Sequence, residues 1–155
     1  MSFQIEALPA EPFAHYFDMS DDELAALGAC RMFADEENAF PCRVSLRDAE
    51  IGEELILCNY EHLPVDSPYR ARHAVFVSRG AETRQLAQGD LPEHLAHRLL
   101  SLRGFTKGGM LKTADVSEGD DLRAGLSAIL EDAEIDFVDI HNARQGCFHA
   151  RARRV

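Results

Sequence analysis

The sequence predicts an α+β fold: a single domain over residues 1–155, with three or four helices packed on a largely antiparallel sheet. Three observations predict it. The 155 residues, 46% hydrophobic and 28% charged, have the composition of one globular domain with its own core. Helical patterns with capping signals recur along the chain, and β-like stretches lie between them. Several β-like stretches follow one another across short turns instead of alternating strictly with helices, which favours antiparallel pairing.

Four segments carry helical signals. Ser20 and Glu23 form a capping box, and Gly28 is the expected stop of the helix that they begin. Asp90 is a plausible cap for a later helix whose leucines are spaced four apart on one face. The last helix has an acidic first turn and a continuous apolar stripe. We therefore expect helical structure at residues 12–17, 20–28, 90–100 and 120–133.

The β-like stretches are short and apolar, and turn residues separate them. Two pairs are joined by hairpin turns, at residues 106–109 and 143–146. The connection from Glu61 to Arg72 is the longest in the first half, and a loop of that length is either functional or mobile. Strands are predicted at residues 30–34, 43–46, 55–60, 73–77, the stretch up to Phe105, 110–116, 136–142 and 147–152.

The charge balance limits the classes of partner. The formal net charge of −11 repels a phosphate backbone, so we expect no nucleic-acid partner and no binding to anionic membranes. The first residues lack the pattern of a secretion signal, and no apolar run is long enough to cross a membrane. Four cysteines without a C-x-x-C pair fit reduced thiols. The sequence therefore predicts a cytoplasmic location and leaves the oligomeric state open.

Two segments carry more polar residues than their apolar surroundings predict, at residues 58–73 and 139–147. Both place these residues at strand ends, where a rigid scaffold commonly presents a site. We expect the two segments to contribute to one cleft, and arginines near it favour an anionic ligand. The alternative for the arginines is salt bridging to the many carboxylates. The predicted ligand-binding residues are Arg43, Asn59, Tyr60, His62, Tyr69, Arg70, His73, Asn142 and Arg144.

His141 is the best candidate for a general acid or base. It shares a strand face with Asp139, and that carboxylate could fix the imidazole tautomer. Cys147 is a second candidate, as a nucleophile whose thiol pKa a nearby Arg144 would lower. The alternatives are a hydrogen-bonded structural histidine and a buried, inert thiol.

The sequence predicts no metal site and no cofactor. No H-x-H, H-x-x-x-H or H-E-x-x-H motif occurs, so further ligands for Asp139 and His141 would have to come from far along the chain. Three classes of function remain. A domain that binds a small anionic molecule is favoured, because the polar residues collect at strand ends. The alternatives are an enzyme that uses His141 on a small anionic substrate, and a protein-interaction module.

Several runs together resemble a known family, the bacterial domain-of-unknown-function family 1203. The resemblance extends to residues 3–12 and the helix at 20–28, and so covers nearly the whole chain. It implies one complete, free-standing domain in a bacterial cytoplasm, and it carries no activity, substrate or residue role. The runs are residues 41–50, 59–62, 68–70 with His73, and 141–144 with Gly146 and Cys147.

Overall fold

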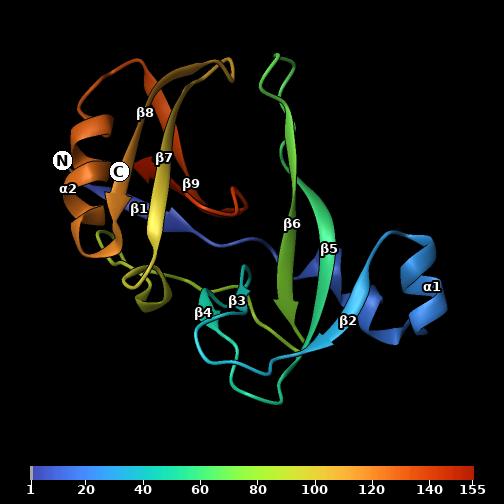
Figure 1. The fold of residues 1–155 in the computed structure, drawn as a ribbon. Coiled ribbons are helices and arrows are strands. Elements are labelled where there is room, and N and C mark those ends of the chain that lie inside the picture. Colours follow the sequence, from blue (N-terminus) through green and yellow to red (C-terminus); the bar gives the residue numbers. More distant parts are fainter. Residues whose placement is uncertain (1) are drawn as a thin grey trace.

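The computed structural model describes residues 2–155, and these residues form two five-stranded sheets (Figure 1). Sheet A is antiparallel, with the order β1 (Phe3–Glu6), β10 (Phe148–Arg154), β9 (Ile135–Asn142), β7 (Leu99–Thr106) and β8 (Leu111–Glu118). Sheet B is mixed, with the order β2 (Cys30–Phe33), β5 (Glu54–Leu63), β6 (Ala71–Ser78), β3 (Pro41–Cys42) and β4 (Arg47–Asp48). Within sheet B, β3 runs parallel to β6.

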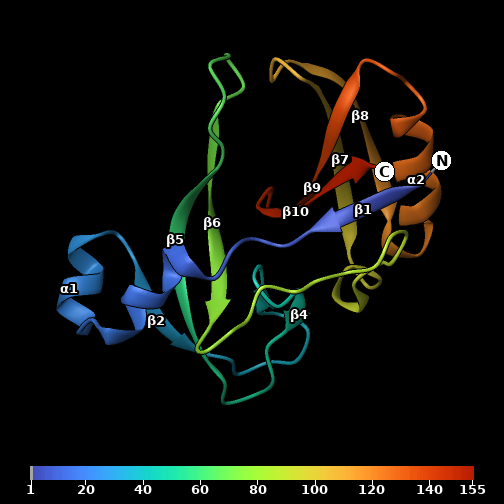
Figure 2. The ribbon, with the colours of Figure 1, turned by 180° about the vertical axis from the view of Figure 1, so that it is seen from behind.

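The predicted α+β class, with three or four helices packed on one sheet, is wrong, because the fold is mostly β. The helical elements are short: η1 (Glu11–Asp18), α1 (Asp21–Ala26), η2 (Glu93–Leu95), η3 (Gly119–Asp121) and α2 (Leu122–Leu130). Figure 2 shows α1 and α2 at opposite ends of the molecule, α2 beside sheet A and α1 beside β2. From residue 2 to residue 155, no helix has the length and apolar character needed to span a membrane.

The capping signals in the sequence correctly predicted both ends of helix α1. Ser20 caps α1, since its side-chain oxygen accepts a hydrogen bond from the Glu23 backbone nitrogen at 3.2 Å. The chain leaves α1 through Gly28, whose positive φ of 71° suits glycine. The predicted hairpins around residues 106–109 and 143–146 are confirmed by the pairing of β7 with β8 and of β9 with β10.

Two predicted elements are wrong. The helix at 90–100 is only the single turn η2, because the chain enters the central strand β7 at Leu99, and Leu100 is buried against α2 and its neighbours. The strand at 43–46 is a tight turn between β3 and β4, in which Leu46 has a φ of 53°. The loop predicted from Glu61 to Arg72 is shorter, since β5 continues to Leu63 and β6 begins at Ala71.

Alternation along the strands gives sheet A two different faces. Val138 and Ile140 of β9 pack in the apolar core beneath α2. The residues that alternate with them, including Phe137 and Asp139, face sheet B, where Phe137 packs with Leu63 of β5. A buried seam therefore joins the two sheets.

The seam has an apolar cluster on each side of a polar layer. Toward the hairpin tips, Leu63, Phe105 and Phe137 pack together, and Ser67 of the β5–β6 loop donates to the Gly109 carbonyl at 2.8 Å. On the other side, Phe148 of β10 packs into the core of sheet B. The polar layer between them contains three of the histidines named above.

Candidate functional site

Three imidazoles from three strands meet in the seam: His62 of β5, His73 of β6 and His141 of β9. The His62 ring centroid lies 4.8 Å from that of His73 and 5.2 Å from that of His141, and the His73 and His141 centroids are 5.0 Å apart. His62 Nε2 and His73 Nδ1 are 2.6 Å apart, and the His62 ring stacks on Phe148 at 4.4 Å. The two polar segments of the sequence therefore meet here, in what we call the three-histidine cluster.

A buried carboxylate adjoins this cluster. Asp139 is fully buried and receives two hydrogen bonds from Arg151, from Nε to Oδ1 at 2.6 Å and from Nη2 to Oδ2 at 3.0 Å. Its Oδ2 also lies 3.5 Å from His62 Nδ1. Burial alone would raise the pKa of Asp139, but the neighbouring His62 ring and the hydrogen bonds and charge of Arg151 outweigh it and lower that pKa. Asp139 is therefore a carboxylate at neutral pH.

The pairing of Asp139 with Arg151 depends on a β-bulge. The register of β10 against β9 shifts between Phe148 and Ala150, and this shift sets Arg151 directly opposite Asp139. Arg151 also stacks on Phe137, with its guanidinium carbon 4.0 Å from the ring centroid. If the same sequence paired in a regular register from Phe148 onward, Ala150 would lie opposite Asp139.

His141 is held by the backbone and not by Asp139. Its Nδ1 lies 2.8 Å from the Gly146 carbonyl, which can only accept, so Nδ1 carries the proton. The shared strand face predicted for Asp139 and His141 is correct, but the imidazole nearest the carboxylate is that of His62. Burial lowers the pKa of His141 to about 3, so this imidazole is neutral at pH 7.

A separate cleft of about 460 Å³ opens beside the seam, and we call it the arginine cleft. Residues from the segment 38–43, from β5 and β6, from the segment 97–99 that follows η2 and from the β9–β10 turn line it. Four predicted site residues contribute to it, namely Arg43, Asn142, Arg144 and Cys147, together with Asn38, His97, Arg98 and Gln145. Among the described residues that line this cleft, none is an aspartate or a glutamate.

Arg43 is an unusual cation, because it is buried and its side-chain hydrogen bonds go to backbone carbonyls. Its Nε donates to the Phe148 carbonyl at 2.7 Å and its Nη1 to the Pro41 carbonyl at 2.6 Å. Within residues 2–155, no carboxylate lies at ion-pair distance from it. Burial lowers the pKa of Arg43 to about 10, which still leaves it charged at pH 7.

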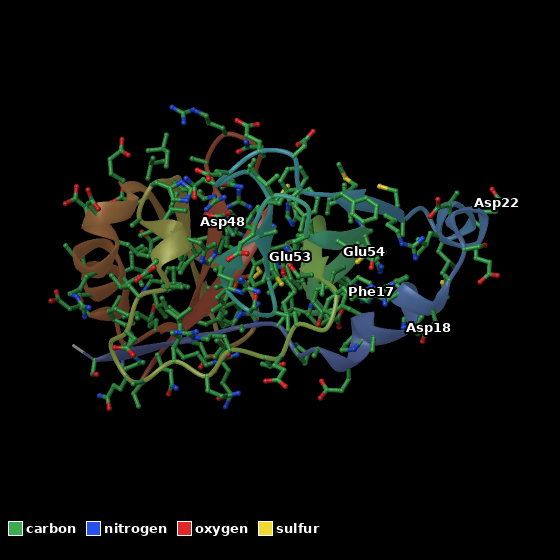
Figure 3. The ribbon with its side chains drawn as sticks, turned by 90° about the horizontal axis from the view of Figure 1, so that it is seen from below. Phe17, Asp18, Asp22, Asp48, Glu53 and Glu54 are labelled. Carbon is green, nitrogen blue, oxygen red and sulfur yellow. The ribbon has the colours of Figure 1, made fainter. Side chains whose placement is uncertain are left out.

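The other side of the arginine cleft is electrically balanced. Arg98 donates from Nη2 to Asp48 Oδ1 at 2.6 Å and from Nη1 to Asp48 Oδ2 at 3.0 Å, while His97 Nε2 lies 2.8 Å from that same oxygen. Figure 3 shows Asp48 toward the middle of the molecule, far from the end that carries Asp22. Because Asp48 already pairs with Arg98, the two arginines of the cleft without a carboxylate partner among the described residues are Arg43 and Arg144.

A second buried histidine group, the His94–His149 pair, has a different character. The two rings lie 5.4 Å apart between centroids, and none of their four ring nitrogens has a hydrogen-bond partner within the described part of the chain. Burial, and then the Arg98 guanidinium, lowers the pKa of His94 to about 3. Burial, and then Arg43, also lowers the pKa of His149 well below its usual value. Both rings are neutral at pH 7.

The remaining predicted residues lie outside these sites. Tyr60 packs on Phe13, 5.1 Å between ring centroids, and Tyr69 is exposed near Phe105. Arg70 forms an ion pair with Glu61 on the surface. The Asn59 side chain accepts a hydrogen bond from Arg72 at 2.6 Å. Salt bridging thus accounts for Arg70, as it does for Arg47, which pairs with Glu53 at 3.3 Å.

The sequence did not predict several residues of these sites, among them Arg151, Arg98 and His149. Arg151 lies near the C-terminal end of the sequence, and only the bulge brings it to Asp139. Arg98 lies within residues 90–100, for which a helix was wrongly predicted. His149 gave no signal, since a lone histidine in an apolar strand resembles any other core position. The position of Asp139 in the apolar strand β9 was the signal that indicated a buried carboxylate in need of a cationic partner.

The fold and site define a mostly β protein of two sheets, with a polar layer buried in the seam between them. A family model described as "Protein of unknown function (DUF1203)" matches residues 39–154, and the chain belongs to this family. The match begins after α1 and β2. It therefore does not cover residues 3–12 or the helix at 20–28, which the resemblance seen in the sequence had included. No curated protein and no solved structure matches the chain.

Proposed function

We propose that this protein binds a small anionic molecule in the arginine cleft. The observation that carries the proposal is Arg43, a buried cation whose charge no carboxylate of the described residues neutralises. Leaving a buried charge without a counter-ion is costly, and an anionic ligand would supply one.

The composition of the lining supports the same choice. The chain has 27 aspartates and glutamates, yet the lining residues include none in the range that the structure describes. Arg144 is exposed at the mouth, and Asn142 and Gln145 add amide groups. Guanidinium and amide donors are the groups that recognise carboxylates and phosphates. A volume of about 460 Å³ suits a small metabolite.

The residues that line the arginine cleft do not support the hypothesis that His141 acts as a general acid or base on a ligand bound there. The three-histidine cluster does not line this cleft. The proposal therefore assigns binding to the arginine cleft and no bond-making step. No observation favours a protein-interaction module.

Thermal unfolding with a panel of phosphates, carboxylates, neutral sugars and amines tests the proposal. A ligand that binds only the folded state raises the unfolding midpoint, and the shift grows with its concentration. We expect phosphates or carboxylates to raise the midpoint at constant ionic strength. A response to amines or neutral compounds alone would contradict the proposal.

Variants then locate the binding. Arg144→Ala and Asn142→Ala change the mouth without touching the buried hydrogen bonds of Arg43. Loss of one charged hydrogen bond weakens binding about tenfold or more, so calorimetry should show that loss for Arg144→Ala. Arg123→Ala is the matched control, an exposed arginine on α2, and it should bind like the wild type.

A further inference from the structure

We propose that His62, Asp139 and His141 form a binding site for one divalent transition-metal ion, of the kind that prefers imidazole and carboxylate ligands. One ligand atom from each residue lies within 4.8 Å of the other two, and all three side chains are buried. This site is separate from the arginine cleft and does not depend on the proposed anion binding.

His62 has one buried ring nitrogen that its neighbours leave unsatisfied. Its Nε2 is 2.6 Å from His73 Nδ1, and either ring can donate in this hydrogen bond. Nδ1 of His62 is buried without a hydrogen-bond partner in residues 2–155, and it offers a lone pair to a metal ion when Nε2 carries the proton. A buried nitrogen lone pair without a partner is the donor that a metal ion would satisfy.

His141 is prepared in the same way at its other nitrogen. Since Nδ1 donates to the Gly146 carbonyl, Nε2 carries the lone pair. A backbone carbonyl on the second ring nitrogen is the usual support of a metal-binding histidine, because it fixes both the tautomer and the ring orientation.

Asp139 completes the set as a carboxylate whose position Arg151 fixes. Its Oδ2 lies 3.5 Å from His62 Nδ1. Two ligands that are each about 2.0–2.1 Å from a tetrahedral zinc ion are about 3.3 Å apart, so this pair already has nearly the required separation. Closing the widest allowed gap, 4.8 Å, to that value requires side-chain shifts that total about 1.5 Å or less.

The ligand set indicates the class of ion. Two imidazoles and one carboxylate suit zinc and divalent iron, cobalt or nickel better than calcium or magnesium, which prefer oxygen. Three protein ligands leave a fourth position on the ion for water or another small molecule. His73, half-buried at the edge of the cluster, contacts the other ring nitrogen of His62, Nε2, and so supports the orientation of this ring.

Short metal-binding motifs in the sequence could not predict this metal site, for a physical reason. His62 and His141 come from different sheets, so no short motif contains both ligands. Only the packing of β5 against β9 brings them together.

Calorimetric titration of chelator-treated protein with Zn²⁺ tests the proposal, with Mg²⁺ as the comparison ion. We expect one equivalent of Zn²⁺ to bind and Mg²⁺ not to compete. His62→Gln and His141→Gln should each weaken Zn²⁺ binding at least tenfold. His94→Gln is the matched control, a buried histidine outside the site, and should bind as the wild type does. Equal losses in all three variants would overturn the proposal, as would no binding by wild-type protein.

A measurement on the wild type keeps the test decisive if a variant does not fold. Histidine ring ¹⁵N resonances report which nitrogen binds a metal. Zn²⁺ should shift His62 Nδ1 and His141 Nε2 and leave His94 and His149 unchanged. Shifts confined to the exposed His15 and His97 would show surface binding only, and would overturn the proposal.

Discussion

The three-histidine cluster and the His94–His149 pair are both buried, yet they differ in how their polar atoms are satisfied. In the cluster, His141 donates to the Gly146 carbonyl and His62 meets His73 at 2.6 Å. In the pair, all four ring nitrogens lack partners over residues 2–155. Burial alone therefore does not fix the orientation of a histidine ring. The hydrogen bonds of the ring decide whether it is held in one orientation or only fills space.

The largest effect should follow from breaking the support of the cluster. Arg151→Leu leaves Asp139 fully buried without its cation, and breaking a buried ion pair costs about 3–5 kcal/mol. Urea denaturation should show this loss in the free energy of unfolding. Arg153→Leu, on the same strand, removes a half-exposed arginine paired with Glu6 and Asp136 and should cost at most about 1 kcal/mol. Equal losses in the two variants would mean that the Asp139 pair is not special.

The His94–His149 pair should contribute to the acid sensitivity of the protein, together with His141, whose pKa is also lowered to about 3. Both folded-state pKa values lie below the unfolded value of about 6.5, so below that pH the unfolded chain binds protons that the folded chain does not. Stability should therefore be full above pH 6.5 and fall on acidification toward pH 3, by about 1.4 kcal/mol per pH unit for each histidine.

Urea denaturation at pH 6 and pH 5 measures this dependence. The comparison with a variant carrying both His94→Leu and His149→Leu isolates the pair, since Asp48, Arg43, Arg98 and His97 around it remain. A variant with the same pH dependence as the wild type would contradict the assignment.

The smallest predicted effect distinguishes the His94–His149 pair from the three-histidine cluster at neutral pH. His94→Leu removes no hydrogen bond and keeps a similar volume, so the free energy of unfolding at pH 7 should change by at most about 1 kcal/mol. His141→Leu leaves the Gly146 carbonyl without its donor and should cost about 1–3 kcal/mol. The reverse order would show that the hydrogen bond of His141 contributes little.

Local signals in the sequence predicted local structure well. The cap at Ser20, the stop at Gly28 and the hairpin at residues 143–146 depend on neighbouring residues alone, and the structure confirms them. The helix at 90–100 failed because leucines spaced four apart fit both a helix face and a strand entering the core. Tertiary pairing of β7 with β9 decided between them.

The site was predictable only in part, for the same reason. The polar residues at two predicted strand ends correctly indicated that the segments around His62 and His141 meet. The bulge before Ala150, which selects Arg151 as the partner of Asp139, left no signal in the sequence. Nor could the sequence distinguish Arg43, which lacks a carboxylate partner in the described chain, from Arg70, which has Glu61.

The strand order of the sheets has a consequence for the way the chain folds during synthesis. Sheet B uses only residues between Cys30 and Ser78, so its strands are all available early. In sheet A, β1 pairs with β10, joining Phe3 to Arg154. Because synthesis proceeds from the N-terminus, the apolar side chains of Phe3 and Ile5 have no partner strand until β10 has been made, and sheet A closes only then. The three-histidine cluster, which needs β9, forms in that late step, while His62 and His73 are already paired on sheet B.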